Sequence, residues 1–156
     1  MIKTGDALPG HEFTFVTDSG KSTADTQTLF SGKKAVIFAV PGAFTPTCSQ
    51  AHLPGFVALE DEFQRKGVAL FCLSVNDAFV MRAWQQQQNA EAITMLADGA
   101  GSFTQALGLA KDTGEFGGLR AQRFALLVDD GVVTQVCVEA PGQFEVSSAE
   151  AMLKLV

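Results

Sequence analysis

The chain has 156 residues, of which 47% are hydrophobic and 18% charged, and its formal net charge is -6. This length predicts a single domain over residues 1–156, and the acidic balance without a basic stripe argues against a nucleic-acid partner. No apolar run approaches the roughly 20 residues of a membrane span, and no signal peptide is recognised, so we expect a cytoplasmic protein, or an organellar one that has lost a transit peptide.

Six stretches have the composition of β-strands. Residues 34–40 and 68–75 are apolar runs bounded by turn signals, which predicts central strands buried on both faces. The first stretch is expected at a sheet edge, and the last two flank Asp129-Asp130-Gly131, a strong hairpin signal. The predicted strands are residues 13–16, 34–40, 68–75, 93–97, 124–128 and 132–138.

Four helices are expected between and after these strands. In the first, three apolar residues recur at helical spacing before the C-cap Gly67, while Pro54 predicts a bend or break. The other three begin at capping side chains. The alternating order predicts an α/β protein with a central mixed β-sheet flanked by helices. The residues that mark the helices are Phe56, Leu59 and Phe63, then Asp77 with Met81 and Trp84, then Ser102–Gln105, and last Ser147–Glu150.

Cys48 is the most informative residue of the chain. It ends the turn Pro41-Gly42-Ala43-Phe44-Thr45-Pro46-Thr47-Cys48, which follows strand 34–40 at the point where the next helix should begin. Unpaired N–H groups and the helix dipole favour a thiolate at such a position, and the thiolate is the nucleophile of cysteine chemistry. An isolated cysteine is more often an inert core residue, so the surrounding residues decide the interpretation.

These surroundings resemble the active-site loop of the type II, peroxiredoxin-5-like branch of the peroxiredoxins, in the AhpC/TSA thioredoxin-like superfamily. The matching stretches cover essentially the whole chain. The resemblance implies a thioredoxin-like fold and a thiol-dependent peroxidase that reduces hydrogen peroxide and alkyl hydroperoxides. The matches are Pro41 to Ser49, His52-Leu53-Pro54-Gly55-Phe56, Leu73 to Met81, Ala83-Trp84 and Arg123-Phe124.

The resemblance also assigns roles to individual residues. Cys48 would be the peroxidatic nucleophile and would become a sulfenic acid. Thr45, Arg123 and the Cys48 N–H would stabilise charge on the departing oxygen, which requires donors that are fixed before the reaction. Pro41 would shield the thiolate from water. Arg120 is the rival arginine, which spacing alone does not separate from Arg123; the Arg-Phe dipeptide favours Arg123.

His52 follows Cys48 by four residues, so both lie on one helical face if the helix is regular. Cysteine proteases take their histidine from a distant segment, so we expect a local supporting role for His52 rather than general-base catalysis. The turn residue Phe44 is interpreted either as part of a homodimer interface, which the resemblance suggests, or as a wall of its own pocket.

The other cysteines, Cys72 and Cys137, lie in apolar strands and would ordinarily be core residues. Some type II members use a cysteine at the position of Cys72 to form an internal disulfide, so Cys72 is a possible resolving residue. The family's other resolving position falls near Ser147, where no cysteine occurs. A bridge to Cys72 would require unwinding the helix that begins at Cys48.

We therefore expect an external thiol to reduce oxidised Cys48: glutathione, glutaredoxin or thioredoxin. No fused glutaredoxin domain is expected, because no Cys-Pro-x-Cys element follows residue 140. We expect no cofactor and no metal site, since the chain has three cysteines and no Cys-x-x-Cys pair. Two alternatives stay open: a peroxide sensor that passes oxidation to partner proteins by disulfide exchange, and a thioredoxin-like scaffold with an inert thiol.

Overall fold

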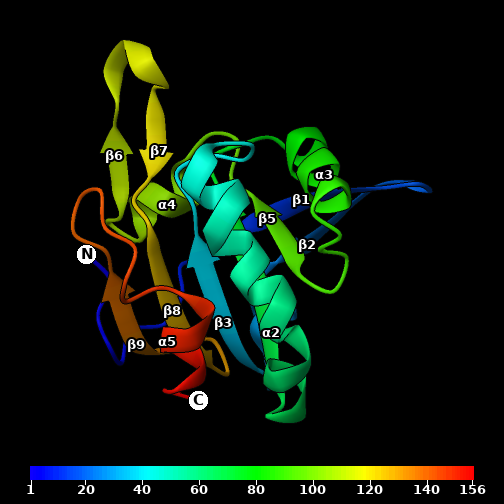
Figure 1. The fold of residues 1–156 in the computed structure, drawn as a ribbon. Coiled ribbons are helices and arrows are strands. Elements are labelled where there is room, and N and C mark those ends of the chain that lie inside the picture. The colour runs from blue at the N-terminus through cyan, green and yellow to red at the C-terminus, as the bar shows by residue number, and fades with distance from the viewer.

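The computed structural model describes residues 1–156 and has the α/β architecture expected from the sequence (Figure 1). A five-stranded sheet with the strand order β5-β4-β3-β8-β9 forms its centre. Strands β3, β4 and β5 are parallel, whereas β8 is antiparallel to both β3 and β9, so the sheet is mixed. Its strands are β3 (Lys34–Ala39), β4 (Val68–Ser74), β5 (Thr94–Ala97), β8 (Phe124–Asp129) and β9 (Val132–Val138).

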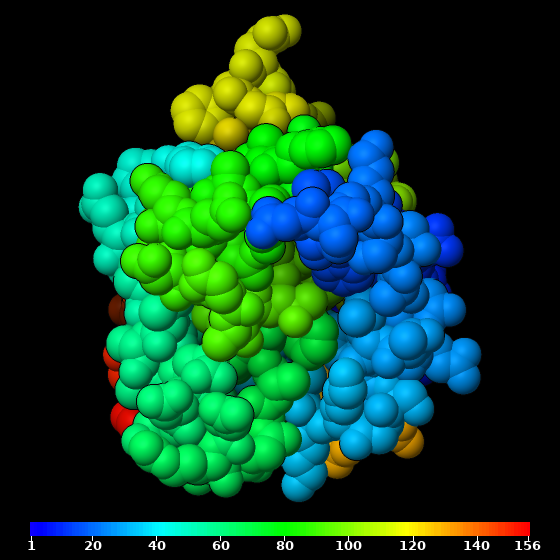
Figure 2. Space-filling view, turned by 90° about the vertical axis from the view of Figure 1, so that its right-hand side faces the viewer, coloured from blue at the N-terminus to red at the C-terminus, as the bar shows by residue number.

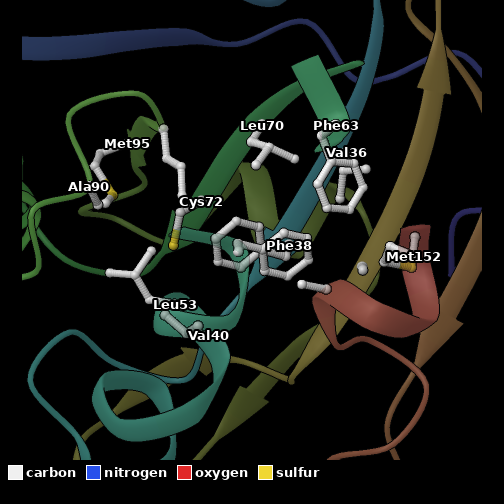
Figure 3. Close-up of a cluster of buried hydrophobic side chains, with 14 of the residues drawn as sticks. Val36, Phe38, Val40, Leu53, Phe63, Leu70, Cys72, Ala90, Met95 and Met152 are labelled. Carbon is white, nitrogen blue, oxygen red and sulfur yellow. The ribbon is translucent and has the colours of Figure 1, made fainter. Parts of the chain in front are cut away.

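Helices cover both faces of this sheet. Side chains of β3 alternate between the two faces, with Val36 and Phe38 in one apolar cluster and Ala35 and Ile37 in the other. Burial on both faces accounts for the continuous apolar run of this strand. Figure 3 shows the first cluster, to which α2 (Leu53–Arg65), α3 (Ala78–Gln87) and α5 (Ala149–Leu153) contribute; α1 (Thr26–Phe30) and α4 (Ser102–Ala106) contribute to the second.

Two small hairpins lie outside the central sheet. The strand expected at the sheet edge is β1 (Glu12–Thr17), but it pairs only with β2 (Gly20–Asp25), which corrects that placement. Residue Phe13 of β1 instead packs into the second apolar cluster. The other hairpin joins β6 (Ala110–Asp112) to β7 (Leu119–Ala121) through η2 (Gly114–Phe116) and projects from one end of the molecule (Figures 1 and 2).

The helix ends follow local side-chain chemistry, with two corrections. Asp77 caps α3 as expected, because its carboxylate accepts a hydrogen bond from the Val80 N–H at 2.8 Å. In α4, however, the first N–H groups bond to Asp98 rather than to Ser102. In α5 the cap is Ser148 and not Ser147, whose hydroxyl donates to a glutamate elsewhere.

Pro54 changes the helix without breaking it. The π-helical turn η1 (Cys48–His52) directly precedes α2, and the Leu53 N–H donates to the Cys48 carbonyl across it. Pro54 has no N–H with which to continue the usual ladder, and a π turn is one way for a helix to absorb that loss. Separately, none of the helices combines the length and apolar character needed to cross a membrane.

Candidate active site

Cys48 lies beyond the carboxyl-terminal ends of the parallel strands β3 and β4. Its side chain is 1% exposed. The preceding turn is held from the end of β4, because the Asn76 carboxamide oxygen accepts the Ala43 N–H at 3.0 Å and the Ser74 hydroxyl at 2.6 Å. Within the turn, the Thr45 hydroxyl donates to the Gly42 carbonyl at 2.6 Å. Ligand sites of open α/β sheets are commonly found at the carboxyl ends of strands.

Arg123 reaches Cys48 because of the strand register. Phe124 of β8 pairs with Ala39 of β3 in antiparallel order, so Arg123 lies level with the residue that follows β3. One guanidinium nitrogen, Nη2, donates to Cys48 Sγ at 3.1 Å, while Nη1 lies 2.8 Å from His52 Nδ1. The guanidinium is always protonated, so it presents a fixed positive charge and two directed donors to this pair.

His52 is held as a neutral ring with a defined tautomer. Because Arg123 can only donate, Nδ1 must be the acceptor, and the ring proton lies on Nε2 and is donated to the Ser147 carbonyl at 2.9 Å. Burial, with the Arg123 charge second, lowers the pKa of His52 to about 3. The ring centroid lies 5.2 Å from that of Phe38 and 4.9 Å from that of Phe144. With both nitrogens engaged, the ring serves to orient Arg123.

Glu139, just after β9, fixes the segment that carries the Ser147 carbonyl. Its carboxylate accepts the N–H groups of Glu145, Val146 and Ser147 and the Ser147 hydroxyl, all within 2.9 Å. Partial burial acts to raise the pKa of Glu139, but these hydrogen bonds outweigh it, and the pKa is lowered. A continuous hydrogen-bonded chain therefore leads from Glu139 through Ser147, His52 and Arg123 to Cys48.

A cleft of about 750 Å³ opens beside this chain. Its walls are the Pro41 turn, the β6–β7 hairpin and the loop that follows β9. Arg123, which contacts buried Cys48, also lines the cleft. A small molecule in this cleft would meet the Arg123 guanidinium, which donates to the buried thiol behind it. The lining side chains used below are Pro41, Lys111, Phe116, Arg120, Arg123, Glu139 and Phe144.

The structure places Arg123 in contact with both Cys48 and His52, and Pro41 lines the adjoining cleft. Arg120, the rival arginine, does not contact Cys48; its guanidinium lies 5.2 Å from the Phe116 ring centroid. Thr45 is in the turn, but its hydroxyl bonds to a backbone carbonyl and not to the thiol. Phe44 is 50% exposed, has a φ of +65° and does not line the cleft, so it is not a wall of this pocket.

The other two cysteines are free thiols in the sheet. Cys72 is fully buried in the same apolar cluster as Cys48, among the side chains shown in Figure 3. Burial, together with the nearby Cys48, raises the pKa of Cys72 well above its ordinary value. Its thiol is therefore a weak nucleophile in this structure. Cys137 is partly buried, and burial raises its pKa as well.

Sequence reasoning missed Glu139, Asn76 and the role of the Ser147 backbone. Asn76 was part of a matching stretch, but nothing in its spacing indicates a bond to a turn 33 residues earlier. A glutamate after an apolar strand, as at Glu139, is a weak signal for a buried acceptor. Backbone groups such as the Ser147 carbonyl leave no mark in a sequence.

Known proteins of similar sequence and structure identify the family of the chain. The Redoxin family model matches residues 3–153. Peroxiredoxin-2B of Arabidopsis thaliana is 45% identical over 157 residues, covering 98% of this chain and 97% of that protein. Peroxiredoxin 5 from Alvinella pompejana is 34% identical with a TM-score of 0.86, covering 99% of this chain and 97% of that one.

A further solved structure is closely similar. The crystal structure of reduced Prx3 in complex with H2O2 from Vibrio vulnificus has a TM-score of 0.96 and 56% identity, and the match covers 99% of each chain. The thioredoxin-like fold that the sequence resemblance implied is therefore confirmed.

Proposed function

The chain belongs to the redoxin family as a peroxiredoxin, and from this membership we propose that it reduces peroxides through Cys48, with Arg123 as the principal electrostatic catalyst. One observation carries the assignment of Arg123. Its guanidinium donates to Cys48 Sγ from one nitrogen and is fixed by the neutral ring of His52 through the other. A pre-organised charge at a reacting sulfur is worth more than a mobile one, because no reorganisation is needed during the reaction.

The first chemical step is a displacement at oxygen. The Cys48 thiolate attacks one peroxide oxygen, so that an S–O bond forms while the O–O bond breaks. The second oxygen leaves with the electron pair and is protonated to water or to an alcohol, and Cys48 is left as a sulfenic acid. Arg123 stabilises the negative charge that moves from sulfur to the leaving oxygen. The Thr45 hydroxyl, whose proton is donated to Gly42, accepts a hydrogen bond from the incoming hydroperoxide.

The second step returns Cys48 to its thiolate at the expense of an external thiol. A thiolate attacks the sulfenic sulfur, an S–S bond forms and hydroxide leaves and becomes water. A second thiol then attacks the mixed disulfide and releases Cys48. Glutathione, alone or with glutaredoxin, is the proposed reductant and thioredoxin the alternative. The burial of Cys72 and its raised pKa support an external thiol over an internal disulfide.

We also propose a homodimer that uses Phe44. The ring is half exposed beside the active-site turn and takes no part in the cleft, as an interface residue would. Sedimentation that shows only a 16.5 kDa monomer at tens of micromolar would rule this out. The cytoplasmic location expected from the sequence stays a prediction, to be checked by fractionation of the source cells.

Steady-state turnover with each reductant tests the function. The native chain and Cys48→Ser are supplied with hydrogen peroxide and with glutathione, glutathione plus glutaredoxin, or thioredoxin with its reductase. We expect turnover with a glutathione-based system and none in Cys48→Ser. Turnover that survives in Cys48→Ser would refute the proposal. Oxidation of Cys48 without turnover by any thiol would favour the peroxide sensor instead.

A further inference from the structure

Arg120 is a cation at the cleft with no carboxylate partner in the protein. None of the three ion pairs of the structure includes it. It lies in β7 directly opposite Lys111 of β6, and both side chains line the cleft that leads to Arg123. Arg120 is partly buried and its charge is not neutralised by a carboxylate, so that charge is available to an anionic ligand.

The position of the Arg120 guanidinium is well defined by its neighbours. It lies over the Phe116 ring at 5.2 Å. It also packs against two glycines: a Cβ at Gly42 would lie 3.2 Å from Nη1, and a Cβ at Gly117 would collide with Nε. Gly42 belongs to the turn that ends in Cys48, so the guanidinium rests on the active-site turn itself.

The charge balance of the cleft favours an anion. Three cations line it, Lys111, Arg120 and Arg123, although the whole chain has a net charge of -6. The only lining carboxylate is that of Glu139, whose oxygens are taken up by the N–H groups of the loop that follows it. A cleft with one sign of charge concentrates ligands of the opposite sign, and the fork of an arginine matches a carboxylate.

We propose that Arg120 and Lys111 form a subsite for the carboxylate of a small acidic reactant. This inference rests on the proposed peroxidase function and adds the charge class of one reactant. Two small molecules carry that chemistry to Cys48: an acidic thiol such as glutathione, and the hydroperoxide of a fatty acid. In either case the subsite holds the carboxylate at the mouth of the cleft while the sulfur or peroxide group extends past Arg123.

Arg120→Gln removes the charge and keeps much of the side-chain volume. The rate constant for reduction of oxidised Cys48 is measured with glutathione and with uncharged 2-mercaptoethanol. A hydrogen bond to a charged group contributes enough that the ratio of the two constants should fall by about 10-fold or more. Arg65→Gln is the matched control, since Arg65 pairs only with Glu62 on α2, away from the cleft, and its ratio should not change.

Gly117→Ala provides a second variant, because its Cβ displaces the Arg120 side chain without deleting the charge; its ratio should fall in the same direction. A parallel series varies the peroxide, with linoleic acid hydroperoxide against cumene hydroperoxide and dithiothreitol as the thiol. Loss confined to glutathione assigns the carboxylate to the thiol, and loss confined to linoleic acid hydroperoxide assigns it to the peroxide.

Equal loss with charged and uncharged reactants, or no loss in Arg120→Gln, would overturn the subsite. Failure of the peroxidase function is distinguishable from both outcomes, because none of the thiols would then support turnover of the native chain.

Discussion

Replacing His52 by glutamine tests whether the buried ring is neutral in the folded protein. The glutamine amide offers an N–H to donate to the Ser147 carbonyl and an oxygen to accept from Arg123 Nη1, so it can make both hydrogen bonds of the neutral ring. The variant also removes the proton-binding group that burial and Arg123 keep neutral in the folded protein. The substitution therefore alters the pH dependence of the stability of the protein, while both hydrogen bonds of the ring can be kept.

The size of the pH effect follows from the two pKa values of His52. The pKa is about 3 in the folded protein, against an ordinary value of 6.5 for a solvated histidine. Below pH 6.5 the unfolded chain binds a proton that the folded chain does not, so acid stabilises the unfolded state. The contribution of the neutral His52 ring to the free energy of unfolding is complete above pH 6.5 and is lost as the pH falls towards 3. Going from about pH 8 to about pH 5 therefore lowers the free energy of unfolding by about 2 kcal/mol through His52.

Denaturant unfolding at both pH values measures this difference in the native chain and in His52→Gln. The native chain should lose about 2 kcal/mol more than the variant on going to the lower pH. His11 and the carboxylates are present in both proteins, so their effects cancel in the comparison. Equal losses in the two proteins would refute the neutral, buried state of His52 and with it the fixed orientation of Arg123.

Three further substitutions test other parts of the site. Thr45→Val should slow oxidation by hydrogen peroxide about 10-fold, because one hydrogen bond to the peroxide is lost, whereas Thr45→Ser, which keeps the hydroxyl, should retain most of the rate; equal rates would remove Thr45 from the mechanism. Glu139→Gln should cost about 2 kcal/mol of stability, because loop N–H groups lose a charged acceptor, and should slow alkylation of Cys48 at neutral pH; exposed Glu145→Gln is its control. Cys72→Ala should keep most glutathione-linked turnover, and mass spectrometry should find Cys48 joined to glutathione; a Cys48–Cys72 bridge in the native chain would contradict this.

Features that depend on residues close together in the sequence could be predicted from it. Asp77 caps its helix through a contact three residues away, and Asp130 and Gly131 adopt the positive φ values of +51° and +77° that a tight hairpin needs. Where two neighbouring serine hydroxyls could each accept the capping hydrogen bond, the prediction is off by one residue. Ser147 has capping-box spacing, but Glu139 takes its hydroxyl, so Ser148 caps the helix instead.

Features that depend on strand register could not be placed from the sequence. Arg123 and Arg120 are equivalent by spacing, and only the pairing of β8 with β3 directs Arg123 to Cys48, 75 residues earlier. The β6–β7 hairpin was missed because its strands have three residues each and lack an alternating apolar pattern. The acidic anchor Glu139 works through backbone groups, which a sequence does not reveal.

The rate constant for oxidation of Cys48 by hydrogen peroxide, in the native chain and in Arg123→Ala, tests the central claim most directly. Trp84 is the only tryptophan, and its indole donates to the hydroxyl of Ser49, next to Cys48, at 3.0 Å, so stopped-flow fluorescence can follow the reaction. Loss of one pre-organised donor should reduce the rate constant by about 10²–10³-fold, with Cys48→Ser giving no transient. A folded Arg123→Ala protein that reacts at nearly the native rate would contradict the account.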